Sequence, residues 1–74
     1  MINNRDKKFL KAFGENLREL RTEHGLSQQD LALQADINKN QISNIERGEV
    51  NPTITTLNSI AKALKIPTKN LLDF

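Results

Sequence analysis

The chain has 74 residues, a length that suits one domain, and its 11 Lys and Arg residues against 9 Asp and Glu residues give a net charge of +2. It contains no cysteine, which excludes disulfides and thiolate metal sites. No apolar run reaches the ~18 residues of a membrane helix, and the N-terminal sequence MINNRDKK lacks the apolar core of a signal peptide. We therefore expect one cytoplasmic domain over residues 1–74 that does not enter a membrane.

Positive charge is concentrated near the N-terminus, whereas the middle of the chain is slightly acidic. The early cations are Arg5, Lys7, Lys8, Lys11, Arg18 and Arg21. Residues 25–49 carry only two Lys or Arg, against four carboxylates: Lys39 and Arg47, with Asp30, Asp36, Glu46 and Glu49. A protein that binds nucleic acid through charge alone would be far more basic. If this chain binds DNA, its charge is not the whole reason.

Two helices are predicted before residue 36. Over residues 6–23, apolar side chains recur at helical spacing in one stripe that we assign to the core: Phe9, Phe13, Leu17 and Leu20. Gly25 ends this helix, because glycine readily adopts the left-handed backbone that follows many helices. Ser27 begins a second helix as its N-cap, and Asp30 completes the capping pattern. The narrow inward face of this second helix consists of Leu31, Ala32 and Ala35.

Three further helices are predicted after a short break at residues 35–37. Asp36 is expected to take a left-handed conformation there, and Asn38 caps a third helix that Gly48 ends. The segment TITTLNSI has the β-branched content of a strand, but Pro52 and a capping Thr53 before helically spaced apolar residues favour a fourth helix. Its apolar residues are Leu57, Ile60, Ala61 and Leu64. Pro67 marks the next boundary, and Thr68 caps a short fifth helix with Leu71 and Leu72. The predicted fold class is all-α.

The two sides of the third helix differ in chemistry. At about 100° per residue, Ile42 and Ile45 point together toward the core. The opposite side carries amide, hydroxyl and cationic groups: Asn40, Ser43, Asn44 and Arg47, with Lys39 and Gln41 on the flanks. Two helices joined by a short turn, the second with an amide-rich outer face, are typical of a helix-turn-helix, here over about residues 27–47. Such a helix fits the major groove of B-DNA, although a small helical bundle with a solvated polar face is the alternative.

Short motifs in residues 13–74 carry a family resemblance. In order along the chain they are LRELR, GLSQ, LA, ISNIERG, NP, IAKAL and LL. With these motifs the chain resembles the Xre-type helix-turn-helix family, which includes the phage lambda-type repressors and Cro. The resemblance implies a compact five-helix, lambda-repressor-like domain whose third helix reads the major groove of double-stranded DNA.

The resemblance also implies roles for individual residues. The positions that match the base-reading residues of the family are Lys39, Asn40, Ser43 and Asn44. Those that match its contacts to the DNA backbone are Gln28, Asn38, Arg47 and Asn51. Arg21 and Glu46 match an ion pair that joins the first helix to the end of the third. The chain departs from the family at Asp36, where glycine is common, and this places a negative charge near the DNA-facing turn.

The sequence offers little for catalysis or for a bound cofactor. His24 is the single histidine, and the chain has no cysteine that could join it as a metal ligand. It contains neither a credible Ser-His-acid arrangement nor a glycine-rich phosphate loop. We expect a protein that is not an enzyme, with no metal and no cofactor.

The function that we predict is sequence-specific regulation of transcription, with repression favoured. Few cations lie on the proposed face, so one copy should bind weakly, and we expect a homodimer on a palindromic operator with half-sites roughly 34 Å apart. The alternative is a protein-interaction module such as the antitoxin of a toxin-antitoxin pair. Such a protein usually carries an extension that covers its partner, and a chain that ends at Phe74 disfavours it. The operator sequence stays open.

Overall fold

The helices and their order follow the prediction closely. The computed structural model describes the backbone of residues 4–74 and the side chains of residues 6–74. Within that range the chain forms four α-helices and a final 3-10 helix, without a strand: α1 (Asn4–Glu23), α2 (Gln28–Ala35), α3 (Lys39–Glu46), α4 (Ile54–Leu64) and η1 (Thr68–Leu72). The all-α class is confirmed, but the count of five α-helices is wrong, because η1 is a short 3-10 turn. No helix in residues 4–74 combines the length and the apolar character needed to cross a membrane.

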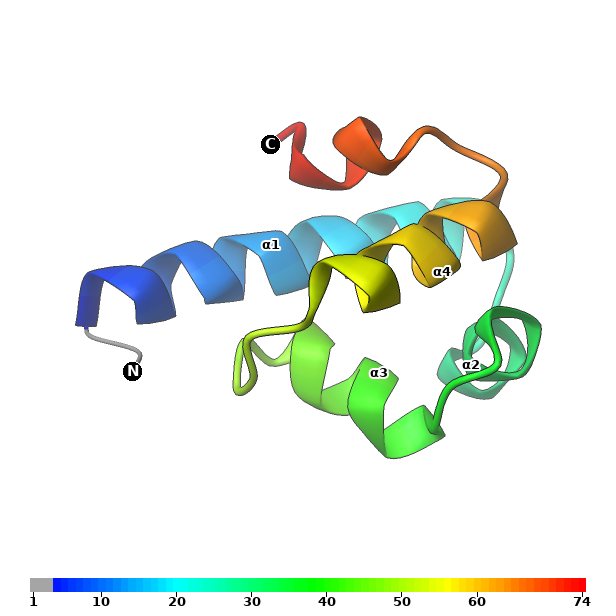
Figure 1. Ribbon diagram of the computed structural model, residues 1–74, viewed down its shortest axis with the longest axis horizontal. Coiled ribbons are helices and arrows are strands. Elements are labelled where there is room, and N and C mark those ends of the chain that lie inside the picture. The colour runs from blue at the N-terminus through cyan, green and yellow to red at the C-terminus, as the bar shows by residue number, and fades with distance from the viewer. Residues whose placement is uncertain (1–3) are drawn as a thin grey trace.

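Helix α1 is a long rod that packs mainly against α3 and η1, whereas α2 packs against α3 and α4 (Figure 1). Leu10, Phe13 and Leu17 are buried along it, and Gly25 at φ 70° ends the turn after it. The prediction that Phe9 belongs to the core is wrong, since its side chain is 55% exposed. Phe9 instead borders an open apolar hollow together with Leu57 of α4 and Leu72 of η1. Its ring also contacts Phe74, with the centroids 5.5 Å apart.

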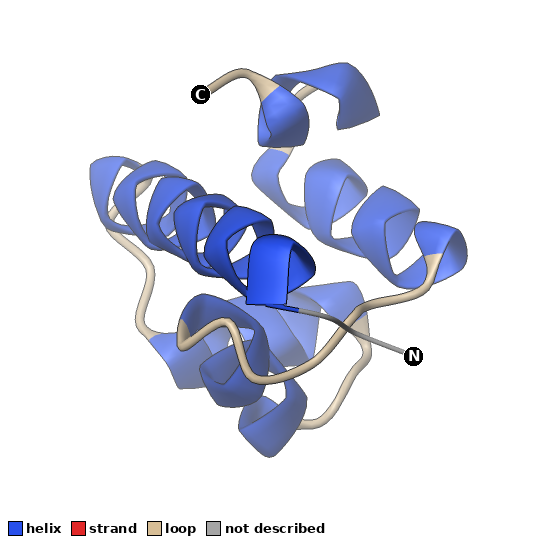
Figure 2. Cartoon of the chain, turned by 90° about the vertical axis from the view of Figure 1, so that its left-hand side faces the viewer, coloured by secondary structure: helices blue, strands red, loops and turns tan. Residues whose placement is uncertain are grey.

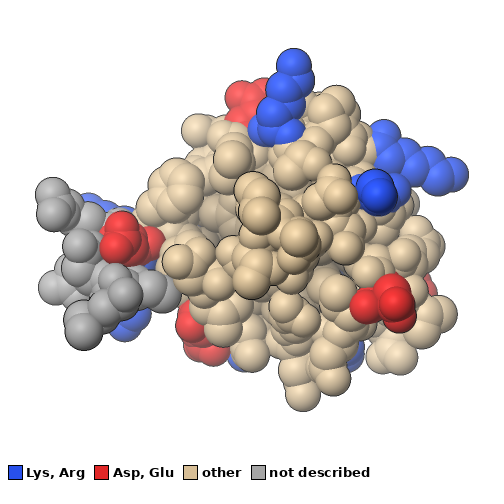
Figure 3. All heavy atoms as spheres, viewed as in Figure 1, with Lys and Arg blue, Asp and Glu red and all other residues tan. Residues whose placement is uncertain are grey.

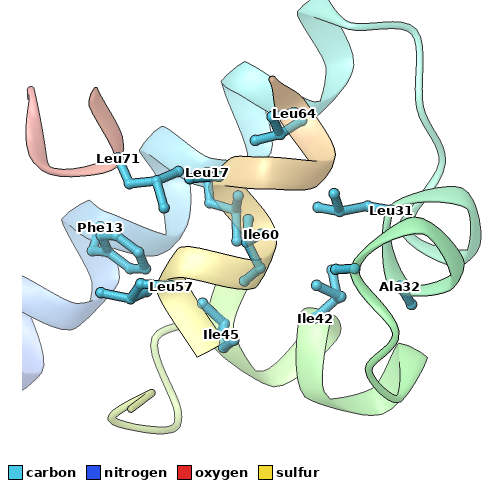
Figure 4. Packing of buried hydrophobic residues seen from close by; sticks show 12 residues of the cluster. Phe13, Leu17, Leu31, Ala32, Ile42, Ile45, Leu57, Ile60, Leu64 and Leu71 are labelled. Atoms are coloured by element: carbon cyan, nitrogen blue, oxygen red, sulfur yellow. The ribbon is translucent and has the colours of Figure 1, made fainter. Parts of the chain in front are cut away.

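The core lies between α1, α3 and α4 and is closed by α2 and η1 (Figure 4). Each of the five elements contributes a large side chain that is less than 2% exposed: Leu17, Leu31, Ile42, Ile45, Ile60, Leu64 and Leu71. Burying one such Leu or Ile side chain contributes roughly 1.5–3 kcal/mol. Ala32 and Ala35 are also buried, and their small side chains let α2 lie close to its neighbours. In α3 the buried side chains are Ile42 and Ile45, so the packing of this helix depends on them.

The chain after α4 differs in detail from the prediction. Thr68 does not cap the last helix, because Pro67 occupies the N-cap position and makes no side-chain capping bond. The Thr68 hydroxyl donates to Asn58 Oδ1 at 3.2 Å instead, and so ties η1 to α4. Leu71 is fully buried, and its carbonyl accepts from Asn16 Nδ2 at 2.9 Å. The last turn thus closes the core through Leu71.

Candidate nucleic-acid interface

Three local features define the helix-turn-helix: the cap of α2, the turn after it and the cap of α3. Ser27 and Asp30 form a reciprocal capping box at the start of α2, as predicted. Asp36 takes the left-handed conformation at φ 58° and ψ 45°, and the backbone N–H of Ile37 donates to Ala32 O at 3.0 Å. Asn38 Oδ1 then accepts from the N–H of Asn40 at 2.7 Å and so caps α3. These bonds fix the direction in which α3 leaves the turn.

Helix α3 has one buried side and one open side. Ile42 and Ile45 are 0% and 1% exposed, and both lie in the core. Lys39 and Asn40 are exposed at the start of the helix, while Ser43 and Asn44 are half-buried. Within residues 6–74 the side chains of Lys39 and Asn40 form no hydrogen bond. The N-terminal end of α3 therefore presents unpaired polar groups to solvent.

At the C-terminal end of the open side, Arg47 forms hydrogen bonds with three neighbouring side chains. Its guanidinium donates to the Ser43 hydroxyl, to Asn44 Oδ1 at 2.5 Å and to Glu49 Oε1 at 3.2 Å. The pair with Glu49 is solvent-exposed on both sides, at 53% and 58% of the side chains. Exposed pairs of this kind contribute about 0–1 kcal/mol. Arg47 is consequently held in place only loosely and can exchange these acceptors for others.

A buried ion pair fixes α3 against α1. Arg21 Nε donates to Glu46 Oε2 at 2.6 Å, Arg21 Nη2 donates to Glu46 Oε1 at 3.1 Å, and both side chains are at most 10% exposed. Gln28 Nε2 donates to Glu46 Oε1 at 3.0 Å, so the first residue of α2 joins the same group. Arg21 Nη1 also donates to Leu26 O at 2.8 Å. Three helices therefore meet at one carboxylate, in the arrangement expected from the pairing of Arg21 with Glu46.

The comparisons with known proteins agree with this geometry. A family model described as helix-turn-helix matches residues 17–71. The chain belongs to the helix-turn-helix family. It is 40% identical over 63 residues to the control protein C.BamHI of Bacillus amyloliquefaciens, covering 84% of this chain and 78% of that protein. It is 44% identical over 59 residues to the transcriptional regulator DdrOP3 of Deinococcus deserti, covering 80% of this chain but only 46% of that protein.

A solved structure of a related protein has the same fold. The restriction-modification controller protein C.AhdI from Aeromonas hydrophila superposes with a TM-score of 0.83 at 39% identity. The match covers 84% of this chain and 94% of that one. The two proteins thus share the fold in which α2 and α3 form the helix-turn-helix.

Two of the predicted backbone-contacting residues have other neighbours in this helix-turn-helix domain. Asn38 uses its side-chain oxygen for the α3 cap. Asn51 is exposed in the loop after α3, and it borders an apolar hollow that is lined also by Phe9, Leu10, Phe13, Pro52, Leu57 and Leu72. Gln28 and Arg47, by contrast, border one hollow together with Arg18 and Ser43. Gln28, Asn38 and Arg47 thus belong to α2 and to the two ends of α3, whereas Asn51 borders a hollow lined by residues of α1, α4 and η1.

The lysines near the N-terminus belong to no motif in the sequence that gives them a role. Lys7, Lys8 and Lys11 lie beside Arg47 and Gly48, although they are about forty positions away in the chain. Lys7 and Lys11 are one helical turn apart, which indicates a common face of α1. The sequence gives no sign that this face meets the end of α3. The side chain of Arg5 lies outside the described residues.

Proposed function

We propose that this chain is a transcriptional regulator that binds double-stranded DNA by placing α3 in the major groove. One observation carries the proposal: Ile42 and Ile45 bury one side of α3 completely, whereas Asn40 and Asn44 lie on its open side. A helix with this profile fits the major groove, where base edges display hydrogen-bond donors and acceptors. The membership of the helix-turn-helix family supports the same function.

The base-reading residues follow from the open side of α3. Asn40 and Asn44 can each meet an adenine edge with two hydrogen bonds, and Lys39 can donate to guanine. Ser43, the residue before Asn44, is a further candidate for a base contact. Because Lys39 and Asn40 are exposed and have no partner within residues 6–74, they can bond to bases without breaking an internal bond. They are therefore the first residues that we assign to sequence discrimination.

Contacts with phosphates position the helix rather than specify the sequence. We assign these contacts to Gln28, Asn38, Arg47 and Asn51, together with the free backbone N–H groups at the starts of α2 and α3. Gln28 also donates to Glu46, so a contact to DNA would be relayed directly to the buried pair. A domain seated in the groove of a promoter excludes other proteins from that DNA, and repression is the direction of regulation that we propose.

We further propose that two copies bind one palindromic site. Residues 25–49 are slightly acidic, so the helix-turn-helix segment of one copy gains little from its own charge. Exposed apolar patches are typical contact sites between copies, and the middle of the face shown in Figure 3 carries no charged side chain. Phe9, Leu72 and Phe74 are about half exposed beside the apolar hollow next to α1. We propose these side chains as the contact between copies.

The test is selection of binding sites from random duplex DNA with the wild-type chain, Asn40→Ala and Asn44→Ala. We expect the wild type to enrich one palindromic sequence, and each variant to lose preference at particular base pairs at about 1–3 kcal/mol each. Asn70→Ala is the matched control, since Asn70 is exposed on η1, on the other side of the molecule from α3 (Figure 1). Sedimentation of the wild type on the selected site should show two copies.

Three outcomes would contradict the proposal in different ways. Uniform weakening by Asn40→Ala and Asn44→Ala, with unchanged base preferences, would assign these residues to the backbone. A single copy per selected site would reject the homodimer. Failure of the wild type to enrich any sequence would reject DNA reading and favour a protein-interaction module.

A further inference from the structure

Three lysines of α1 form one hollow with the C-terminal end of α3. Its lining consists of Lys7, Lys8, Lys11, Arg47, Gly48 and Glu49. Cations therefore outnumber carboxylates there, since Glu49 is the one acidic residue of the lining. In Figure 2, which looks toward the N-terminal end of α1, the loop that follows α3 runs beneath that helix end. Charge that is far from α3 in the sequence is thus next to it in space.

Two glycines hold α1 against α3 at this place. A Cβ atom on Gly48 would lie 2.7 Å from Lys11 Cα, and Gly48 has a positive φ of 72°. A Cβ atom on Gly14 would lie 2.4 Å from Ile45 O. Both distances are too short for a side chain, so the backbones of the two segments touch directly. The lysine-bearing end of α1 consequently has a fixed position relative to the groove-reading helix.

The lysines have no evident structural task. Lys7, Lys8 and Lys11 are exposed, and within residues 6–74 none of them forms a hydrogen bond or an ion pair. Cations near the end of a helix can stabilise its dipole. Here, however, the last carbonyl groups of α3 already accept from backbone N–H groups: Ser43 O from Arg47, Asn44 O from Glu49 and Ile45 O from Gly48. The lysine ammonium groups therefore remain available to a ligand.

We propose that Lys7, Lys8 and Lys11 form, with Arg47, a second anion-binding surface that holds the phosphodiester backbone of DNA flanking the bases read by α3. The inference rests on the proposed function. The hollow shares Arg47 with the open side of α3, so an anion bound there lies beside the helix in the groove. This surface would supply the cations that residues 25–49 lack. Affinity and sequence reading would then come from different helices.

The experiment compares two triple variants with the same loss of charge. Lys7→Gln/Lys8→Gln/Lys11→Gln removes the proposed surface. Lys62→Gln/Lys65→Gln/Lys69→Gln removes three exposed lysines, one each in α4, at its C-cap and in η1. Binding to the selected duplex is measured across a salt series, with hydroxyl-radical footprints. The logarithm of the DNA-binding constant falls linearly with the logarithm of the salt concentration, and each lost phosphate contact lowers the magnitude of this slope by about 0.9. We expect the α1 variant to lower it by about 2–3, with unchanged base preferences and loss of flanking protection.

The outcomes separate this inference from the proposed function. If the wild type selects no sequence, the proposed function fails first. If the wild type reads a sequence but both triple variants show the same slope and footprint, the inference is overturned. A lower melting temperature of the α1 variant with an unchanged slope would likewise overturn it, in favour of a structural role. Should the triple variant not fold, Lys7→Gln and Lys11→Gln alone are each expected to lower the slope by about 0.9.

Discussion

The two ends of α3 are built for different tasks. At its N-terminal end the side chains of Lys39 and Asn40 are exposed and form no hydrogen bond within residues 6–74. The cap there joins the Asn38 side chain to the backbone N–H of Asn40. At its C-terminal end Glu46 is buried and accepts from Arg21 and Gln28. The N-terminal end of α3 can therefore stay open to a ligand because its C-terminal end is fixed. Tests that disturb one end and leave the other intact should therefore separate loss of folding from loss of binding.

The largest effect is expected at the fixed end. Glu46→Ala leaves the guanidinium of Arg21 buried without its partner, and breaking a buried pair in this way typically costs about 3–5 kcal/mol. Because 1 kcal/mol shifts the melting temperature of a small domain by roughly 4–8 °C, thermal unfolding measures the change directly. Glu49→Ala is the control, since its pair with Arg47 is exposed and contributes about 0–1 kcal/mol. Equal melting temperatures for the two variants would show that the buried pair does not hold α3.

A smaller effect is expected at the free end. Asn38→Ala removes the side-chain acceptor for the Asn40 N–H, and the loss of such a cap costs about 1 kcal/mol. Denaturant unfolding should register this loss without a change in its slope. Asn51→Ala, in the exposed loop after α3, is the comparison and should unfold as the wild type does. Unchanged stability of Asn38→Ala would mean that α3 begins independently of its cap.

The helices and the turn were predictable because their signals are local. Ser27 and Asp30 form a capping box within four residues, and the left-handed Asp36 lies between two helical patterns. The errors concern features that depend on distant segments. Phe9 continues the periodic stripe of α1, but the hollow that it borders with Leu57 and Leu72 is open, so its side chain stays exposed.

The same reason explains what was missed in the candidate site. The contact of Gly48 with Lys11 joins positions that no local pattern connects, and it depends on the absence of side-chain atoms at the glycine. The ion pair of Arg21 with Glu46 also joins residues that are distant in the chain. It was predicted only because the motifs resembled a family. Residue spacing alone therefore indicates the open side of α3 but not the cations that α1 brings beside it.

The smallest effect is expected at the exposed pair of Arg47 and Glu49, which follows α3. In the free protein Glu49 accepts from Arg47 at 3.2 Å, so a phosphate has to replace this carboxylate and is also repelled by it. Glu49→Gln removes the repulsion, and because the pair is exposed we expect tighter DNA binding by about two- to five-fold at low salt. Stability should change by less than about 0.5 kcal/mol, as for most surface substitutions. Glu23→Gln, an exposed carboxylate at the far end of α1, controls for net charge in the same titration. Weaker binding of Glu49→Gln would instead mean that the carboxylate orients Arg47 for its phosphate, and Glu49 would then be part of the DNA-binding surface.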